Sequence, residues 1–419
     1  MEPIVLERLE LRAVRGIPEL TLDFQAPEPG RGQWTVLLGE NGSGKTTILQ
    51  AVAKALRPRS EDGAVPCRGV ASREYTLHLA EPSGRSQWRT LPSNAKNIER
   101  AETTFPAVGR DVLGYGSRRG GALGGPDRDV SFDPPVAGEL DRVWFVPSLF
   151  DPNARLIHAE TWLRNREHAA LKSGGGAPQA FFESVVQTVL ALLPGIESLE
   201  VGSDEVTVRG AAVRECALAD LADGYLTTLG WTLDFIARWS HVHADLVDGD
   251  FRDRMVALVL VDEIDLHLHP RWQRTILQEI RDTFPVTSFV VTTHNPLTIQ
   301  GARPGEVHVL RRHDDGSVTS RQIDPPLGAD VDDLLTGPWF GLSTTYDPDT
   351  VEKLREHADL LRRGTPRDDA GRQELESTLR DRLSVFGATP EDRELLEEAA
   401  KSGLEGLAGK LSRIRAARK

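Results

Sequence analysis

The feature that most constrains this chain is a glycine-rich stretch at residues 39–46, Gly-Glu-Asn-Gly-Ser-Gly-Lys-Thr. It follows a short apolar run, WTVLL at 34–38, and precedes a segment whose apolar residues Ile48, Val52 and Leu56 have helical spacing. Glycines let backbone N–H groups approach phosphate oxygens closely, and the positive end of the following helix faces the same charge. The order strand, loop, helix therefore predicts a P-loop that binds the phosphates of a nucleotide.

Residues of this loop have separate expected roles. Lys45 is expected to reach the β and γ phosphates of ATP, and the Thr46 hydroxyl is expected to bind Mg²⁺. The other residues that we assign to the nucleotide are Gly39, Asn41, Gly42, Ser43, Gly44 and Thr47. The motif thus predicts ATP and Mg²⁺ as cofactors.

A second motif, Leu-Val-Leu-Val-Asp-Glu at 258–263, ends an apolar run in two acids. A carboxylate at the end of a buried strand is costly unless it holds a cation, so Asp262 is expected to bind the Mg²⁺ shell. Glu263 is placed to activate the attacking water. His294 follows the apolar strand SFVVTT, 31 residues after Glu263, and is expected to hydrogen-bond the γ-phosphate.

A dedicated metal centre is a weaker interpretation of the residues that follow. Asp265, His267 and His269 lie close to the acidic pair. A zinc site needs three or four such side chains to converge, whereas these alternate beyond a strand and Pro270 starts a helix at once. The spacing favours a structural role for them.

The order of predicted elements indicates an α/β fold. We expect two strands within 4–24 with a turn at Gly16-Ile17-Pro18, strands at 75–79, 256–262 and 287–293, hairpins at 199–208 and around Asp315-Gly316, loops at 58–69 and 116–138, and helices at 155–171, 178–193, 223 onward and 270–283. Strands alternating with helices predict a largely parallel sheet with right-handed crossovers. Residues 348–419 are charged and helical in pattern, with a helix start marked by Thr389 and Pro390.

Composition and charge narrow the class of protein. No run approaches about 18 apolar residues, so we expect no membrane span. Two cysteines, Cys67 and Cys216, and an N-terminus without an apolar signal core favour a reduced, cytoplasmic protein. The net charge of −13 argues mildly against non-specific DNA binding, although the tail at 410–419 is locally basic and DNA remains a possible ligand.

Taken together, these motifs resemble the ABC-type ATPase heads of the RecF and SMC class. The closer resemblance is to bacterial ATPases of the overcoming-lysogenisation-defect and Septu type, through VLVDEIDLHLHPRWQ and the later FVVTTHNP. It implies an ABC-type ATPase domain at 1–345, with a mixed sheet and a helical insertion lobe at about 60–250, and a helical C-terminal region at 346–419. We expect this chain to lack the TOPRIM domain that the overcoming-lysogenisation-defect proteins carry.

The resemblance also implies a dimer in which a signature loop of the second copy closes over ATP. Leu221-Ala222-Asp223-Gly224-Tyr225 fits that loop, with Asp223 and Gly224 near the γ-phosphate. Ala222 stands where a serine is usual, and the lost hydroxyl bond to a charged phosphate costs roughly 1.5–3 kcal/mol. Arg15, in the LRAVRGI strand-turn that also holds Arg12, matches a basic residue near the nucleotide in such relatives.

Three functions are compatible with these features. The first is an ATP-hydrolysing homodimer, or higher oligomer, that regulates a separate effector, such as a nuclease, in bacterial antiviral defence. The second is a RecF-like DNA-repair ATPase, which DNA-stimulated turnover would distinguish. The third is a weakly hydrolysing, nucleotide-gated scaffold, for which Ala222 is the main support.

Overall fold

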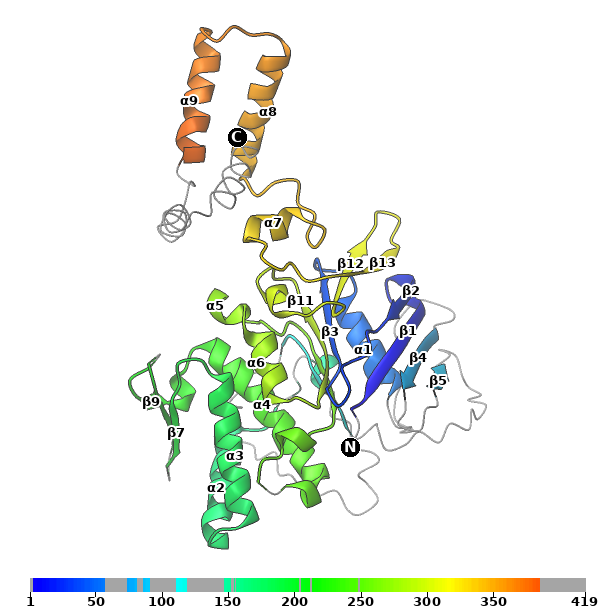
Figure 1. Ribbon diagram of the computed structural model, residues 1–419, viewed down its shortest axis with the longest axis vertical. Coiled ribbons are helices and arrows are strands. Elements are labelled where there is room, and N and C mark those ends of the chain that lie inside the picture. The colour runs from blue at the N-terminus through cyan, green and yellow to red at the C-terminus, as the bar shows by residue number, and fades with distance from the viewer. Residues whose placement is uncertain are drawn as a thin grey trace, which may run out of the picture. The chain divides into compact units, whose positions relative to one another are not determined.

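The computed structural model describes residues 3–56, 74–80, 86–90, 111–118, 147–151, 154, 156–202, 205–211, 213–247 and 249–384. The chain divides into two compact units, Met1–Gly341 and Leu342–Lys419 (Figure 1). Most of the loops predicted at 58–69 and 116–138, together with Cys67, lie outside the described residues.

A six-stranded sheet forms the centre of the first unit. Its order is β13 (Val318–Ile323), β12 (Val307–Arg312), β3 (Trp34–Gly39), β11 (Ser288–Thr293), β10 (Leu258–Val261) and β6 (Val112–Tyr115). All neighbours pair in parallel except β13, which pairs antiparallel with β12. The predicted α/β class and largely parallel sheet are therefore confirmed. Only β11 separates β3, which precedes the P-loop, from β10, which precedes Asp262. Because these three strands are parallel, the loops that follow them leave the same edge of the sheet.

A second, antiparallel sheet has the order β2 (Ile17–Asp23), β1 (Val5–Val14), β4 (Glu74–Ala80), β5 (Ser86–Thr90). The helix that follows the P-loop, α1 (Lys45–Ala55), shares one buried apolar cluster with strands of both sheets. The turn was predicted at Gly16-Ile17-Pro18, but in the structure it begins one residue earlier, at Arg15 and Gly16. Ile17 already belongs to β2 and pairs with Val14. Pro18 is tolerated in β2 because this strand lies at the sheet edge, where a missing N–H costs no ladder bond.

A helical lobe packs on the other side of the central sheet. It contains α2 (Ala159–Ser173), α3 (Ala177–Leu192) and the long, mostly buried α4 (Asp223–Val242). A small sheet of β7 (Ser198–Val201), β8 (Val206–Arg209) and β9 (Cys216–Ala217) adjoins it. Gly174, Gly175 and Gly176 all have positive φ between α2 and α3, a backbone conformation that side chains disfavour. The predicted helices and hairpin are thus confirmed, with shifts of a few residues at their ends.

One predicted helix is wrong as a continuous element. Residues 270–283 form two helices, α5 (Pro270–Gln273) and α6 (Ile276–Thr283). At the break, the Thr275 hydroxyl donates to the Trp272 carbonyl at 3.2 Å, a local bond that competes with the helix ladder. The Trp272 indole N–H also reaches Glu279 at 2.8 Å, which holds the two pieces together.

The remaining helices are short or belong to the second unit. α7 (Val331–Thr336) lies in the first unit, whereas α8 (Pro348–Arg362) and α9 (Ala370–Ser384) form an antiparallel pair in the second (Figure 1). Glu376 of α9 contacts His357 of α8 at 3.1 Å, which joins the pair, and Arg372 within α9 donates to the same oxygen at 2.7 Å. The helix start predicted at Thr389-Pro390 and the basic tail lie outside the described residues. None of the described helices is both long and apolar enough to cross a bilayer.

Candidate nucleotide site

The P-loop has the conformation that its glycines allow. Gly42 and Gly44 have φ values of 83° and 103°, which disfavour any side chain. A Cβ on Gly39 would lie 2.7 Å from both the Leu310 carbonyl oxygen and the Ser43 hydroxyl. The Ser43 hydroxyl is buried and has no hydrogen-bond partner among the described residues. Gly44, the N-cap of α1, offers no side-chain cap to the first N–H groups of the helix, which could therefore donate to a ligand. The loop thus fits a phosphate group.

Lys45 lies within this loop rather than in solvent. Its Nζ donates to the Gly39 carbonyl at 2.6 Å and to the Glu40 carbonyl at 3.0 Å, and the residue is only 7% exposed. Burial lowers the pKa of the Lys45 ammonium, and nearby carboxylates, chiefly that of Asp262, oppose the shift. The ammonium is thus held at the mouth of the loop by carbonyls that a phosphate oxygen can replace.

Thr46 and Asp262 meet although they are 216 positions apart. The Thr46 hydroxyl donates to Asp262 Oδ2 at 2.8 Å, and the Thr292 hydroxyl donates to Asp262 Oδ1 at 2.6 Å. Thr292 Oγ1 also accepts from the Glu263 N–H at 2.8 Å. A hydroxyl and a carboxylate at this spacing supply the oxygen ligands that Mg²⁺ prefers, so these residues fit the expected cation.

Glu263 and His294 face one another at the ends of β10 and β11. His294 Nδ1 lies 3.6 Å from Glu263 Oε1, and their side chains are 54% and 26% exposed. Glu263 has a φ of 49°, a left-handed conformation that is rare for a residue with a side chain. Both groups reach the solvent from which an attacking water would come.

Asp265, His267 and His269, which were considered for a metal centre, do not form a group of metal ligands. His269 Nδ1 accepts from the Arg271 N–H at 3.3 Å and caps α5. His267 takes a left-handed conformation in the loop, with a φ of 63°. In the part of the chain that the structure describes, no three His, Cys, Asp or Glu side chains are grouped to hold a metal.

The residues predicted to form the signature loop lie at the start of α4. Ala222 is its N-cap and makes no side-chain cap bond, and both Ala222 and Asp223 are exposed. Gly224 is buried, and a Cβ there would lie 2.6 Å from the His267 carbonyl oxygen. Glycine is therefore required where α4 packs on the loop that follows Glu263. No described hydrogen bond joins residues 221–225 to the P-loop of the same chain.

The β1–β2 turn lies beside the P-loop, and an arginine that sequence reasoning missed connects them. Arg312, in β12, donates to the Gly42 carbonyl and to the Gly16 carbonyl, each at 2.8 Å. The predicted nucleotide residue Arg15 is exposed in this turn, whereas Arg12 pairs with Glu19 at 3.5 Å. Arg312 thus joins the turn that carries Arg15 to the P-loop.

A buried polar chain links α4 to the acidic pair. The Tyr115 hydroxyl donates to Asp234 Oδ2 at 3.0 Å, and Arg238 donates to the same oxygen at 2.6 Å. The Tyr115 carbonyl accepts from the Asp262 N–H at 2.8 Å. Neither Tyr115 nor Asp234 was recognised from the sequence as part of the site, because each looks like an ordinary core or helix residue there.

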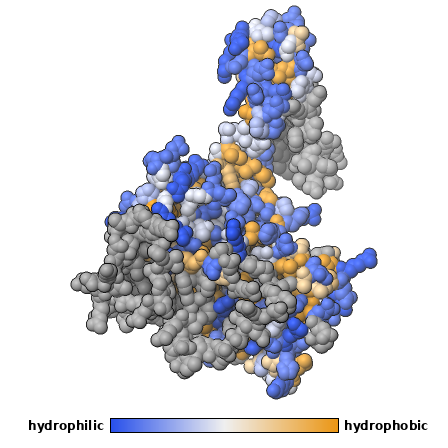
Figure 2. Space-filling model, turned by 180° about the vertical axis from the view of Figure 1, so that it is seen from behind, coloured by the Kyte–Doolittle hydropathy of each residue, from blue (hydrophilic) through white to orange (hydrophobic). Residues whose placement is uncertain are grey.

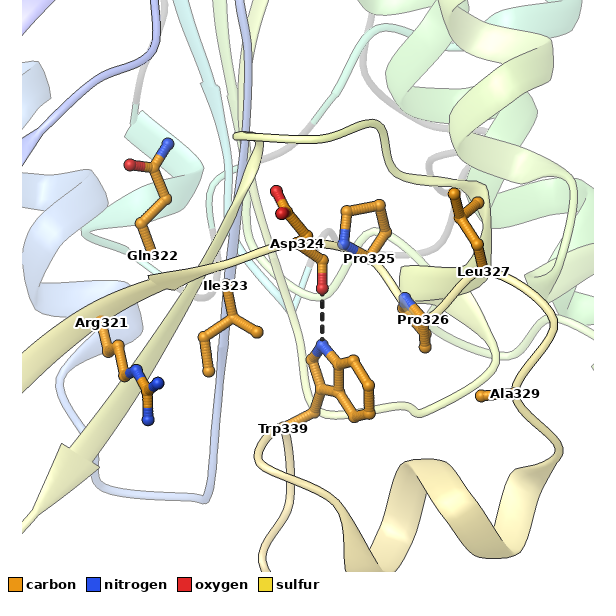
Figure 3. A pocket seen from close by; sticks show the side chains of 9 residues that line it. All are labelled: Arg321, Gln322, Ile323, Asp324, Pro325, Pro326, Leu327, Ala329 and Trp339. Atoms are coloured by element: carbon orange, nitrogen blue, oxygen red, sulfur yellow. Dashed lines mark hydrogen bonds between the residues drawn. The ribbon is translucent and has the colours of Figure 1, made fainter.

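A separate groove lies at β13 of the first unit (Figure 3). Trp339 closes one side of it and donates from its indole N–H to the Asp324 carbonyl at 3.0 Å. Leu327, which lines the groove, is 82% exposed. Seen from behind, the described surface carries both hydrophilic and hydrophobic areas (Figure 2). None of the lining residues belongs to the P-loop, the acidic pair or the start of α4.

Two family models match separate parts of this chain. The family model "ABC transporter" matches residues 27–165, which include the P-loop. The model "AAA domain, putative AbiEii toxin, Type IV TA system" matches residues 235–300, which include Asp262, Glu263 and His294. A "Septu protein PtuA" of Bacillus mycoides (strain KBAB4) is 26% identical over 397 residues, covering 91% of this chain and 50% of that protein. The chain is thus similar to ABC-type ATPases of the Septu and retron type.

Other relatives match shorter segments of this chain. A "Retron Vc95 probable ATPase" of Vibrio cholerae serotype O1 biovar El Tor is 31% identical over 108 residues, 26% of this chain and 21% of that protein. The chain thus spans about half the length, or less, of these two curated relatives. Among solved structures, the SMC head domain from Thermotoga maritima is 15% identical, with 77% of this chain and 100% of that chain covered and a TM-score of 0.39. That degree of structural similarity is too low to support a functional conclusion.

Proposed function

We propose that this chain binds ATP with Mg²⁺ and hydrolyses it to ADP and phosphate. The observation that carries the proposal is the hydrogen bond between Thr46 and Asp262, because it brings the P-loop and the acidic strand end together at one point. Mg²⁺ held there would neutralise charge on the β and γ phosphates. Lys45 would bind the same phosphates from the other side of the loop.

The chain's own residues then supply the proton chemistry. Glu263 would accept a proton from the attacking water, and His294, 3.6 Å from it, would hydrogen-bond the γ-phosphate. The exposure of both side chains supports access of water from the open side of the site. Asp262 stays ionised in this scheme, because its role is to hold the cation.

We further propose that a second copy completes the site. The exposed N-terminus of α4 carries unpaired helix N–H groups that suit a γ-phosphate, and Asp223 and Gly224 begin that helix. Closing on ATP would then turn nucleotide binding into dimer assembly. The assembly would regulate a separate effector protein in antiviral defence, a role that the likeness to Septu and retron proteins supports.

The test is ATP turnover by the purified protein, with and without linear duplex DNA, and with Glu263→Gln as the blank. We expect Mg²⁺-dependent turnover that Glu263→Gln abolishes and that DNA leaves unchanged. Turnover that persists in Glu263→Gln would contradict the assignment of the base. Strong stimulation by DNA would favour the RecF-like alternative.

A second candidate is a nucleotide-gated scaffold that hydrolyses ATP very slowly. It is favoured by Ala222, which caps α4 without the hydroxyl that a serine would offer to phosphate. Ala222→Ser distinguishes the two. If turnover is limited by closure of the dimer, the added hydroxyl should raise it roughly tenfold or more, as expected for a bond of about 1.5–3 kcal/mol to a charged group.

A further inference from the structure

We propose that Thr292 is a positioning residue that fixes both acids of the nucleotide site through one hydroxyl group. The inference rests on the proposed function and deepens it. Thr292 lies in the middle strand, β11, between the strand of the P-loop and the strand of the acids, and it is fully buried. Its side chain is shielded from solvent, and its hydroxyl reaches the site through Asp262 and Glu263.

The hydroxyl of Thr292 is the donor in one hydrogen bond and the acceptor in another. It donates to Asp262 Oδ1 at 2.6 Å, which directs the other oxygen, Oδ2, toward the Thr46 hydroxyl. It accepts from the Glu263 N–H at 2.8 Å. A single side chain therefore orients the carboxylate that would hold the cation and also anchors the backbone of the proposed base.

The backbone of Thr292 adds a third contact to the same loop. Its carbonyl accepts from the Ile264 N–H at 3.0 Å, so Thr292 binds two consecutive amides after Asp262. Glu263 between these contacts has a φ of 49°, which a residue with a side chain adopts only when its surroundings impose it. The hydroxyl is thus part of what holds Glu263 in that conformation.

Valine at this position would keep the shape and the carbonyl contact but lose the hydroxyl. Asp262 would lose the donor at Oδ1, and the Glu263 N–H would lose its acceptor inside a buried site. Groups that orient a metal ligand from behind typically change metal affinity or activity by about 10–100-fold when removed. We expect effects of that size on the Mg²⁺ dependence of nucleotide binding and on kcat.

The experiment compares Thr292→Val with Thr292→Ser and with a matched control, Thr287→Val. Thr287 is also fully buried, and its hydroxyl donates to the Met255 carbonyl next to the opposite end of β11. We measure ATP binding as a function of Mg²⁺ concentration, binding without Mg²⁺, and kcat at saturating Mg²⁺. Thermal unfolding of each variant checks that it is folded.

Thr292→Val should require about tenfold or more Mg²⁺ for half-maximal enhancement of ATP binding and should lose kcat, while metal-free ATP binding stays at the wild-type value. Thr292→Ser should restore most of both losses, and Thr287→Val should show neither. If Thr292→Val behaves like Thr287→Val while wild type binds and turns over Mg·ATP, the positioning role is refuted and the proposed function stands. If wild type itself fails to bind Mg·ATP, both are overturned. Should Thr292→Val unfold, Thr292→Ala replaces it in the same comparison.

Discussion

Replacing Lys45 by alanine should weaken ATP binding strongly and leave the free protein folded. The ammonium of Lys45 donates to the Gly39 and Glu40 carbonyls at 2.6 and 3.0 Å, both part of the loop itself. ATP would exchange these neutral acceptors for charged phosphate oxygens. The contribution of Lys45 therefore appears mainly in the bound state.

The size of the effect follows from the number of contacts. A hydrogen bond to a charged group contributes about 1.5–3 kcal/mol, so two phosphate contacts at the lower value give about 3 kcal/mol. That corresponds to an increase of roughly 150-fold in the Kd for ATP. Without nucleotide, the variant loses a buried cation whose pKa burial already lowers, so its unfolding temperature should change little.

Titration with ATP in the presence of Mg²⁺ measures this effect, with Lys54→Ala as the matched control. Lys54 belongs to the last turn of the same helix, and its Nζ lies 5.4 Å from the Phe150 ring centre rather than in the P-loop. Lys54→Ala should bind ATP like wild type. A Kd for Lys45→Ala within a few-fold of wild type would refute the P-loop assignment of this lysine.

Two further predictions concern packing and pH. Gly224→Ala would place a methyl group 2.6 Å from the His267 carbonyl oxygen and should destabilise the fold by about 1–3 kcal/mol. The control, Gly371→Ala in the exposed part of α9, should leave the stability unchanged, and thermal unfolding of both variants measures the difference. Burial lowers the pKa of His308 to about 4, against the opposing charge of Asp23, so the unfolded state binds more protons between about pH 6.5 and 4. The contribution of His308 to the free energy of unfolding is therefore fully present above pH 6.5 and falls by about 3 kcal/mol towards pH 4. Denaturant titrations at several pH values should show a flatter pH dependence of this free energy in His308→Gln than in wild type. An unchanged pH dependence would refute the role of His308.

The parts of the site that could be predicted from the sequence are contiguous motifs. The P-loop and the acidic pair each combine their chemistry with the strand that positions it, so residues such as Lys45 and Asp262 can be identified without a structure. The parallel sheet then places those strand ends at one edge, as the hydrogen bond between Thr46 and Asp262 shows.

Residues that act across the fold could not be found in this way. Arg312 contacts the Gly42 carbonyl from 270 positions away, and in the sequence it is one of three arginines in an ordinary hairpin. Thr292 sits inside an apolar strand, where a threonine is usual for its β propensity. The break between α5 and α6 was missed for a related reason: the Thr275 hydroxyl donates to the carbonyl of Trp272, three residues earlier, and the apolar spacing on either side continues across the break.

The most direct test of the central claim, that two copies complete the nucleotide site, is sedimentation of Glu263→Gln with and without Mg·ATP. Because Glu263 lies at the open side of the site and its loss should leave ATP uncleaved, the variant should accumulate as an ATP-dependent dimer. Lys45→Ala, which should not retain ATP, serves as the control and should show no nucleotide-dependent change. Glu263→Gln that binds ATP but sediments identically with and without it would contradict the account.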